Sequence, residues 1–228
     1  MQSLPEILLI DKPIGITSFD VIRVLRKKTG VRKFGHAGTL DPLATGLMIL
    51  GVEAGTKKLE NYLKLDKEYI AEIRVGESRT TGDLEGSIME EKEVEEIFSD
   101  EKISSTLAQL LGTHELPVSA YSAIKVDGKA MYKRAREAES TGDIVTDVPL
   151  RSMTVYETEL LSHESAIIDD KKRHIVTVRF KVASGVYIRS LAVEFGRLLG
   201  NYPSTIQLLR RTKVGEFNIE DATQLEDF

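Results

Sequence analysis

Two long stretches of alternating apolar and polar residues constrain the fold of this chain more than any other feature. They cover residues 153–161 and 174–183, and such alternation is typical of neighbouring strands with one buried face. Further strands are predicted at residues 6–10, 47–52, 69–75 and 205–214, and helices at 18–29, 93–98, 101–111, 131–139 and 186–199. Because strands and helices do not alternate regularly, we expect an α+β fold with a mixed, largely antiparallel sheet.

The first predicted helix has recognisable ends. Thr17 or Ser18 is positioned to cap its N-terminus, and Gly30 is positioned to end it. The apolar residues Phe19, Ile22 and Leu25 recur at helical spacing, so we expect them on one face of the helix.

Composition excludes several classes of site. The chain has no cysteine, which rules out disulfide scaffolds, zinc ribbons, iron–sulfur clusters and thiol nucleophiles, and fits a reducing compartment. Residues 1–10 have no positively charged stretch before their apolar run, and no apolar run approaches the ~20 residues of a membrane span. We therefore expect a soluble, cytoplasmic protein.

Charge is segregated along the chain, although the net value is only 31 − 36 = −5. Residues 171–213 carry ten basic residues against the single acid Glu194, and residues 1–35 carry seven against three. Residues 85–101 are acidic and are expected to form a solvated insertion, and residues 216–228 are acidic as well. The two basic tracts predict an electropositive face that binds backbone phosphates, the alternative being ordinary solvated faces.

The segment 35–46 (GHAGTLDPLATG) concentrates glycine, proline, a histidine and a carboxylate between a helix and a buried strand. Glycine and proline fix the backbone of such a loop and leave a few side chains to project. Asp41 precedes Pro42, which disfavours helical geometry at Asp41. Asp41 is therefore either a turn or helix cap, or a nucleophile or base on a rigid loop.

The same segment resembles motif II of the pseudouridine synthases in the form found in the TruB family. Other segments resemble family motifs in the same order along the chain. They are 11–18 (DKPIGITS), 67–69 (KEY) with Gly76 and 80–83 (TTGD), 121–125 (YSAIK) with Gly128, Tyr132 and 135–136 (AR), 185–191 (GVYIRSL) and 208–212 (LLRRT). The tract 116–120 departs from the family pattern, which leaves the local loop geometry open.

The resemblance implies the pseudouridine synthase fold, with a catalytic cleft along the sheet, and a set of site residues. Asp41 is implied to be the essential carboxylate and Arg189 its ion-pair partner, whereas the sequence alone would make Arg189 a surface residue of a basic helix. Tyr69 is implied to stack on the target base, although a tyrosine in an alternating strand is usually a core residue. The remaining implied roles are support of the pocket by Lys12, contact with displaced bases by His36, and lining of the uracil pocket by Tyr187 and Leu209.

The resemblance further implies isomerisation of uridine 55 in the T arm of tRNA to pseudouridine, on a nucleotide flipped out of the stack. We expect no cofactor and no metal, because the four histidines lack ligand spacing and no phosphate-binding glycine motif is present. We expect a monomer that needs neither guide RNA nor a protein partner. Two alternatives are an RNA-binding factor without activity and a member of the guide-dependent archaeal and eukaryotic subfamily.

The expected domain organisation is a catalytic domain over residues 1–215 and a short acidic tail over residues 216–228. Members of the family usually continue into an RNA-binding domain of the PUA type, and we expect no such domain within these 228 residues.

Overall fold

The computed structural model describes residues 4–122, 124–143, 145 and 147–228. These residues form two compact units. The first comprises Met1–Ala71, Arg179–Gly185 and Leu208–Phe228, and the second comprises Glu72–Val178 and Val186–Gln207. Strands β4 (Lys67–Val75), β11 (Lys171–Val182) and β12 (Ser204–Val214) contribute residues to both. None of the described helices has the length and apolar character that crossing a membrane requires.

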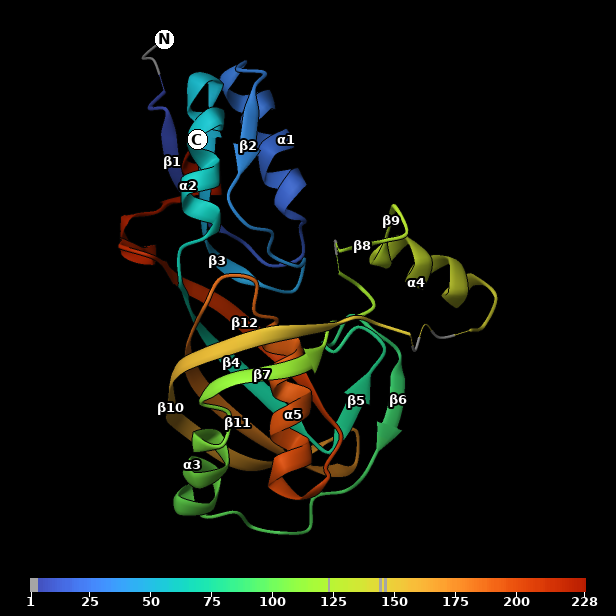
Figure 1. The fold of residues 1–228 in the computed structure, drawn as a ribbon. Helices are drawn as coiled ribbons and strands as arrows, with labels where there is room; N and C mark the ends of the chain where they lie inside the picture. The colour runs from blue at the N-terminus through green and yellow to red at the C-terminus, as the bar shows by residue number, and fades with distance from the viewer. Residues whose placement is uncertain (1–3, 123, 144, 146) are drawn as a thin grey trace. The chain divides into compact units, whose positions relative to one another are not determined.

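The first unit is a mixed sheet with helices beside it (Figure 1). Its strand order is β14-β1-β3-β12-β4-β11; β1 pairs antiparallel with β3, whereas β12 and β3 are parallel. Besides the shared strands, its elements are β1 (Ile7–Lys12), α1 (Ser18–Thr29), β2 (Phe34–His36), β3 (Thr45–Val52), η1 (Glu53–Lys58), α2 (Leu59–Leu63), β13 (Phe217–Asn218), η2 (Ile219–Asp221), β14 (Thr223–Gln224) and η3 (Leu225–Asp227).

Helix α1 begins and ends where the sequence predicts. Thr17 is its N-cap in a capping box with Asp20, and Gly30 ends it with a φ of 74°. Of the residues that the spacing places on one face, Ile22 and Leu25 are buried together with Val21, whereas Phe19 is 48% exposed. At about 100° per residue, Phe19 lies at the edge of the buried stripe, which Val21 completes on the other side.

Residues 216–228 pack on the first unit. Strand β14 pairs in parallel with β1, and Leu225 is buried. The Lys28 ammonium donates to the carbonyls of Leu225 and Glu226 at 3.2 and 2.8 Å. This acidic segment is therefore held by backbone pairing, an apolar contact and a cation of α1.

The second unit has the strand order β12-β4-β11-β10-β7, so the two long alternating stretches occupy neighbouring strands, as predicted. Helices α3 and α5 pack against strands of this unit (Figure 1). Its further elements are β5 (Glu77–Arg79), β6 (Ile88–Glu91), α3 (Asp100–Ala108), β7 (Gly112–Pro117), β8 (Lys125–Val126), β9 (Lys129–Ala130), α4 (Met131–Ser140), β10 (Leu150–Ile168) and α5 (Ile188–Gly200). Together the mixed sheet and the helices confirm the α+β class.

The acidic stretch 85–101 differs from its prediction in two ways. Residues 93–98 form no helix, and the stretch is not simply solvated, because Val94 and Phe98 are buried. The Val94 N–H donates to the carbonyl of Lys172 at 3.0 Å. The segment is therefore anchored on β11 by apolar side chains and a backbone hydrogen bond.

Candidate functional site

The loop that carries Asp41 joins β2 to β3 in the first unit. Gly46, at its end, has a φ of +105°, and a Cβ there would lie 2.3 Å from the carbonyl oxygen of Arg211. Gly46 stands opposite Arg211 in the parallel pairing of β3 with β12. Only glycine fits both this backbone conformation and this close approach, so the end of the loop is fixed against β12.

The residue before Asp41 is held by one hydroxyl group. Ser18, 2% exposed at the start of α1, donates through Oγ to the Leu40 carbonyl at 2.9 Å and accepts from the Leu40 N–H at 2.8 Å. Both backbone groups of Leu40 are thereby satisfied. Asp41 is itself half-buried.

The residues after Asp41 are held by Lys12, at the end of β1. Its ammonium is fully buried and donates to the carbonyls of Pro42 and Ala44, at 3.2 and 2.6 Å, and to that of Pro13 at 2.9 Å. The Gly15 N–H donates to the Pro42 carbonyl at 2.8 Å. The backbone is thus fixed on both sides of the carboxylate, and Lys12 supports this loop directly.

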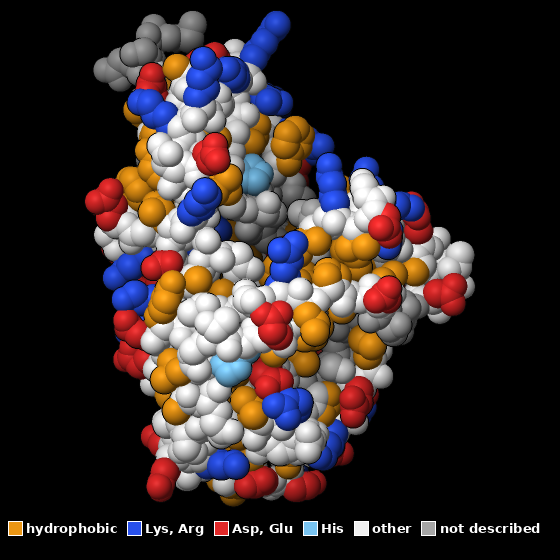
Figure 2. All heavy atoms as spheres, viewed as in Figure 1, with side chains coloured by type: hydrophobic (Ala, Val, Ile, Leu, Met, Phe, Trp, Pro, Cys, Tyr) orange, Lys and Arg blue, Asp and Glu red, His pale blue; other side chains and the backbone are white. Residues whose placement is uncertain are grey.

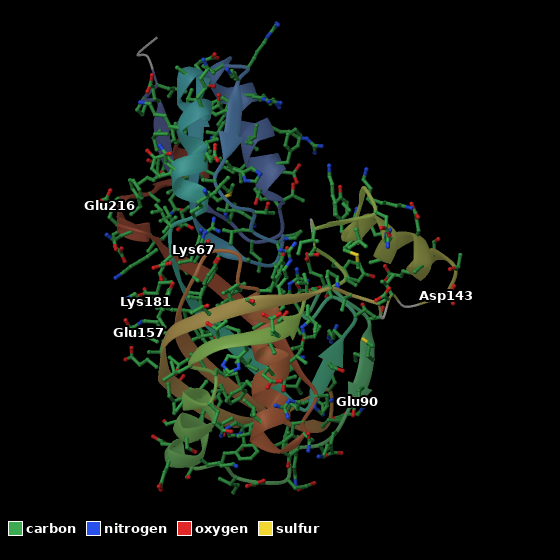
Figure 3. All side chains as sticks on the ribbon, in the orientation of Figure 1. Lys67, Glu90, Asp143, Glu157, Lys181 and Glu216 are labelled. Atoms are coloured by element: carbon green, nitrogen blue, oxygen red, sulfur yellow. The ribbon has the colours of Figure 1, made fainter. Side chains whose placement is uncertain are left out.

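Arg211 is a buried cation of the first unit, whereas the sequence placed it in the basic tract 171–213 that is expected to bind phosphates. It is 1% exposed, and its guanidinium donates to the carbonyls of Leu47, at 2.7 Å, and of Gly38, at 3.4 Å. Burial, and then the charge of Arg211, lowers the pKa of Lys67 to about 8. Lys67 (Figure 3) lies where α2 leads into β4, and its ammonium donates to the carbonyls of Leu63 and Leu65. The sequence places Arg211 in the segment 208–212 and in the basic tract, but neither predicts that it binds the carbonyls of this loop.

Three further predicted site residues belong to the first unit. Burial, and then the charge of Arg211, lowers the pKa of His36, so its imidazole is neutral at pH 7. His36 Nδ1 is buried and has no hydrogen-bond partner among the described residues. Tyr69 and Leu209 are 8% and 7% exposed and lie on the neighbouring strands β4 and β12.

Arg189 and Tyr187 belong to the second unit, at the start of α5. Arg189 is 5% exposed, which excludes the surface role that its helix suggests. Its guanidinium donates to Ser119 Oγ at 2.9 Å and to the carbonyls of Thr81 and Tyr121, and it lies 3.9 Å from the Asp83 carboxylate. Tyr187 is half-buried and is the N-cap residue of α5.

Some segments resemble family motifs, although the sequence assigned no role to their residues. The contacts of Arg189 give two of these segments a structural role. Arg189 joins the segment 80–83 to residues 119–121 and to α5. Ala123, which belongs to the matched segment 121–125, lies outside the described residues. Asp41 and Arg189 belong to different units, and their pairing stays a prediction.

Several cations of the basic tract 171–213 already pair with acids, and phosphate binding by this tract stays a prediction. Lys171 and Arg173 pair with Glu91, and Lys172 pairs with Glu95. Two further pairs are Arg197 with Glu194, at 2.6 Å, and Arg210 with Asp11, at 2.7 Å. These charges are largely neutralised by acids that are mostly distant in sequence. In the described part of the chain, no three His, Asp or Glu residues are arranged to hold a metal ion.

Two curated proteins illustrate the similarity of this chain to known proteins. It is 40% identical over 223 residues to tRNA pseudouridine synthase B of Corynebacterium efficiens, covering 97% of this chain and 71% of that protein. It is 43% identical over 223 residues to tRNA pseudouridine synthase B of Leifsonia xyli subsp. xyli, covering 96% and 70% respectively.

Solved structures give the same result for the fold. The chain superposes with a TM-score of 0.68 and 25% identity on a chain of a Cbf5-Nop10-Gar1 complex, covering 97% of this chain and 52% of that one. It superposes with a TM-score of 0.67 on a chain of an H/ACA RNP bound to a substrate RNA containing 2′-deoxyuridine, and it spans about half of that chain.

A family match covers most of the chain. Residues 26–188, more than half of the 228 residues, match the TruB family pseudouridylate synthase (N terminal domain). With the relatives at about 40% identity, this match shows that the chain belongs to the TruB family of pseudouridylate synthases.

Proposed function

We propose that this chain converts uridine 55 in the T arm of tRNA to pseudouridine, with Asp41 as the essential carboxylate. The reaction breaks the bond between ribose C1′ and uracil N1 and forms a bond from C1′ to C5. C5 loses its proton and N1 gains one, so the reaction needs no net redox change. The observation that carries the proposal is the hold on the backbone on both sides of Asp41, by Ser18 and by Lys12.

A fixed loop matters because catalysis depends on the position of the reacting group. A misplacement of about 1 Å costs roughly 100-fold in rate. The bonds to Leu40, Pro42 and Ala44 restrict the backbone from which the Asp41 side chain projects. The carboxylate then acts on the ribose or the uracil ring as a nucleophile, or accepts the proton as a base.

The other site residues receive their proposed roles around this carboxylate. Arg189 pairs with Asp41 and keeps it ionised and oriented. Tyr69 stacks on the uracil, and Tyr187 and Leu209 line the pocket. His36 contacts the bases displaced when the uridine leaves the stack. The planar imidazole ring offers a flat face on which a base can stack.

The proposal also covers the substrate, the oligomeric state and the partners of the protein. The curated relatives are named for tRNA, and the chain covers about 70% of their length. We propose that it acts on tRNA as a monomer, without cofactor, guide RNA or protein partner, in the cytoplasm, where tRNA is present.

The test uses an unmodified tRNA transcript tritiated at uracil C5 and the protein alone. The wild type should release tritium, and a transcript with cytidine at position 55 should release none. Asp41→Asn should abolish release while tRNA affinity stays within several-fold, because phosphate contacts dominate binding. Asp20→Asn, which changes a carboxylate of the α1 capping box, is the matched control and should keep its rate.

Three results would refute parts of the proposal. Substantial release by Asp41→Asn contradicts the role of the carboxylate. Release only after a guide RNA is added contradicts independent action. Binding by the wild type without release identifies an RNA-binding factor without this activity.

A further inference from the structure

An aromatic side chain is exposed in the first turn of α1, beside the Asp41 loop. Phe19 is 48% exposed, and two arginines one and two turns further along the helix approach its ring. The guanidinium carbons of Arg23 and Arg26 lie 5.1 and 5.7 Å from the ring centroid. An aromatic ring and guanidinium planes are the surfaces on which unpaired nucleobases stack.

The position of Phe19 relates it to the candidate catalytic loop within the same unit. The preceding residue, Ser18, holds Leu40, the neighbour of Asp41. A second exposed apolar residue, Ile14, is 65% exposed and stands between two residues that contact the same loop region. The Lys12 ammonium joins the carbonyls of Pro13 and Pro42, and the Gly15 N–H also donates to Pro42. The exposed side chains of Ile14 and Phe19 therefore lie next to residues that bind the Asp41 loop.

The charge around Phe19 differs from that of the basic tract in the second unit. Among the described residues, no side-chain hydrogen bond or ion pair involves Arg26, Lys27, Arg32 or Lys33. Arg26 Nε is buried without a hydrogen-bond partner in the described part of the chain. Figure 2 shows Lys and Arg side chains gathered over the region of α1 and β2. By contrast, Lys171, Lys172 and Arg173 already have carboxylate partners.

We propose that these residues form an RNA-docking surface for the nucleotides next to the modified uridine. The α1 surface consists of Ile14, Phe19, Arg26, Lys27, Arg32 and Lys33. Phe19 and Ile14 contact a base or ribose that leaves the stack with the target, and the four cations bind backbone phosphates. The inference rests on the proposed function, because it takes Asp41 as the place where the uridine binds.

The chemistry of the surface favours RNA over a protein partner. Protein interfaces are depleted of lysine and match opposite charges across the contact. Here four cations have no carboxylate partner among the described residues, and the first turn of α1 carries an aromatic ring with arginine planes. That combination is the one by which proteins track single-stranded nucleic acid.

The first test measures the dissociation constant for the unmodified tRNA transcript. Phe19→Ala should raise it about tenfold, which is about 1.4 kcal/mol. Phe19→Leu should weaken binding similarly, because leucine has no π face, and Phe19→Tyr should bind like the wild type. Ile97→Ala, in an exposed apolar residue beside Glu95 and Glu96, is the matched control and should leave binding unchanged. Because Phe19 is half-exposed, these variants leave the core intact.

The second test measures how the binding constant depends on salt. Lys27→Ala and Arg32→Ala should each lower the slope of log K against log salt by about 0.7, the value for one lost phosphate contact on a single strand. Lys172→Ala is the control, because Lys172 already pairs with Glu95, and it should leave the slope unchanged.

The outcomes separate this inference from the proposed function. At saturating RNA, Phe19→Ala should keep the wild-type kcat and show a raised KM. If the wild type binds tRNA but releases no tritium, the proposed function is refuted. The docking surface is then refuted as well, because it takes Asp41 as the place where the uridine binds. If the wild type is active and Phe19→Ala, Phe19→Leu and both charge variants bind as it does, the docking surface is refuted.

Discussion

Ser18→Ala tests whether the two hydrogen bonds between Ser18 and Leu40 position the Asp41 loop, because it changes no other residue of the site. The variant removes one oxygen, and with it both the bond donated to the Leu40 carbonyl at 2.9 Å and the bond accepted from the Leu40 N–H at 2.8 Å. Leu40 is 4% exposed, so these two backbone groups lose their partner in a buried place. Alanine is acceptable in the first turn of a helix, so α1 itself should form.

The expected magnitudes follow from that geometry. A buried polar group left unsatisfied costs about 1–3 kcal/mol, so two such groups give roughly 2–6 kcal/mol if the loop does not move. If the loop instead shifts by about 1 Å to satisfy them, stability recovers and the rate falls by about 100-fold. We therefore expect kcat to fall between 10- and 100-fold with little change in tRNA affinity.

The neighbouring residue supplies the control. Thr17→Ala removes the hydroxyl that accepts from the Asp20 N–H at 3.1 Å, which caps the same helix without contacting Leu40. It should lower stability by about 1 kcal/mol and leave kcat unchanged. Single-turnover tritium release measures the rate, and urea unfolding measures stability. A Ser18→Ala enzyme with wild-type kcat, or equal losses of kcat in the two variants, would refute the argument.

Two further predictions concern stability. Gly46→Ala should leave little soluble protein, because the new Cβ would lie 2.3 Å from the Arg211 carbonyl oxygen and the backbone φ is +105°. Soluble yield and thermal unfolding measure this effect, and a wild-type melting temperature would contradict it. Burial, and then the charge of His163, lowers the pKa of His174 from 6.5 to about 4. Below pH 6.5 the unfolded chain therefore binds a proton that the folded chain resists, and roughly 3 kcal/mol of stability present above pH 6.5 is lost as the pH falls to 4. His174→Gln should flatten the pH dependence of urea unfolding over that range, and an unchanged slope would contradict the assignment.

The sequence predicted those features that depend on local pattern. The ends of α1 follow from Thr17 and Gly30, and the alternation of residues 153–161 and 174–183 predicted neighbouring strands. The exposure of Phe19 could not be predicted, because periodicity alone does not locate the edge of a stripe of apolar residues. Its exposure depends on what packs against α1.

Features that depend on long-range contacts could not be predicted. The cations of residues 171–173 look available in sequence, yet Glu91 and Glu95, about 80 residues earlier, neutralise them. Ser18 belongs to the matched segment 11–18, but its bonds to Leu40 could not be predicted, because its partners are backbone groups. A side chain that binds a backbone group far away in the sequence produces no pattern of residue spacing from which the contact could be predicted.

The two buried cations beside the Asp41 loop indicate what this part of the fold is built to do. Lys12 is fully buried and Arg211 is 1% exposed, and both donate to backbone carbonyls of residues 38–47. Burying an ammonium and a guanidinium costs several kcal/mol each, and apolar residues of similar volume often give equal or greater stability. Stability alone therefore does not account for them. Carbonyl oxygens that accept from a fixed cation cannot change position without leaving a buried charge unsatisfied, so the cations make any displacement of the loop expensive. That property serves a loop whose carboxylate must be positioned before the substrate arrives.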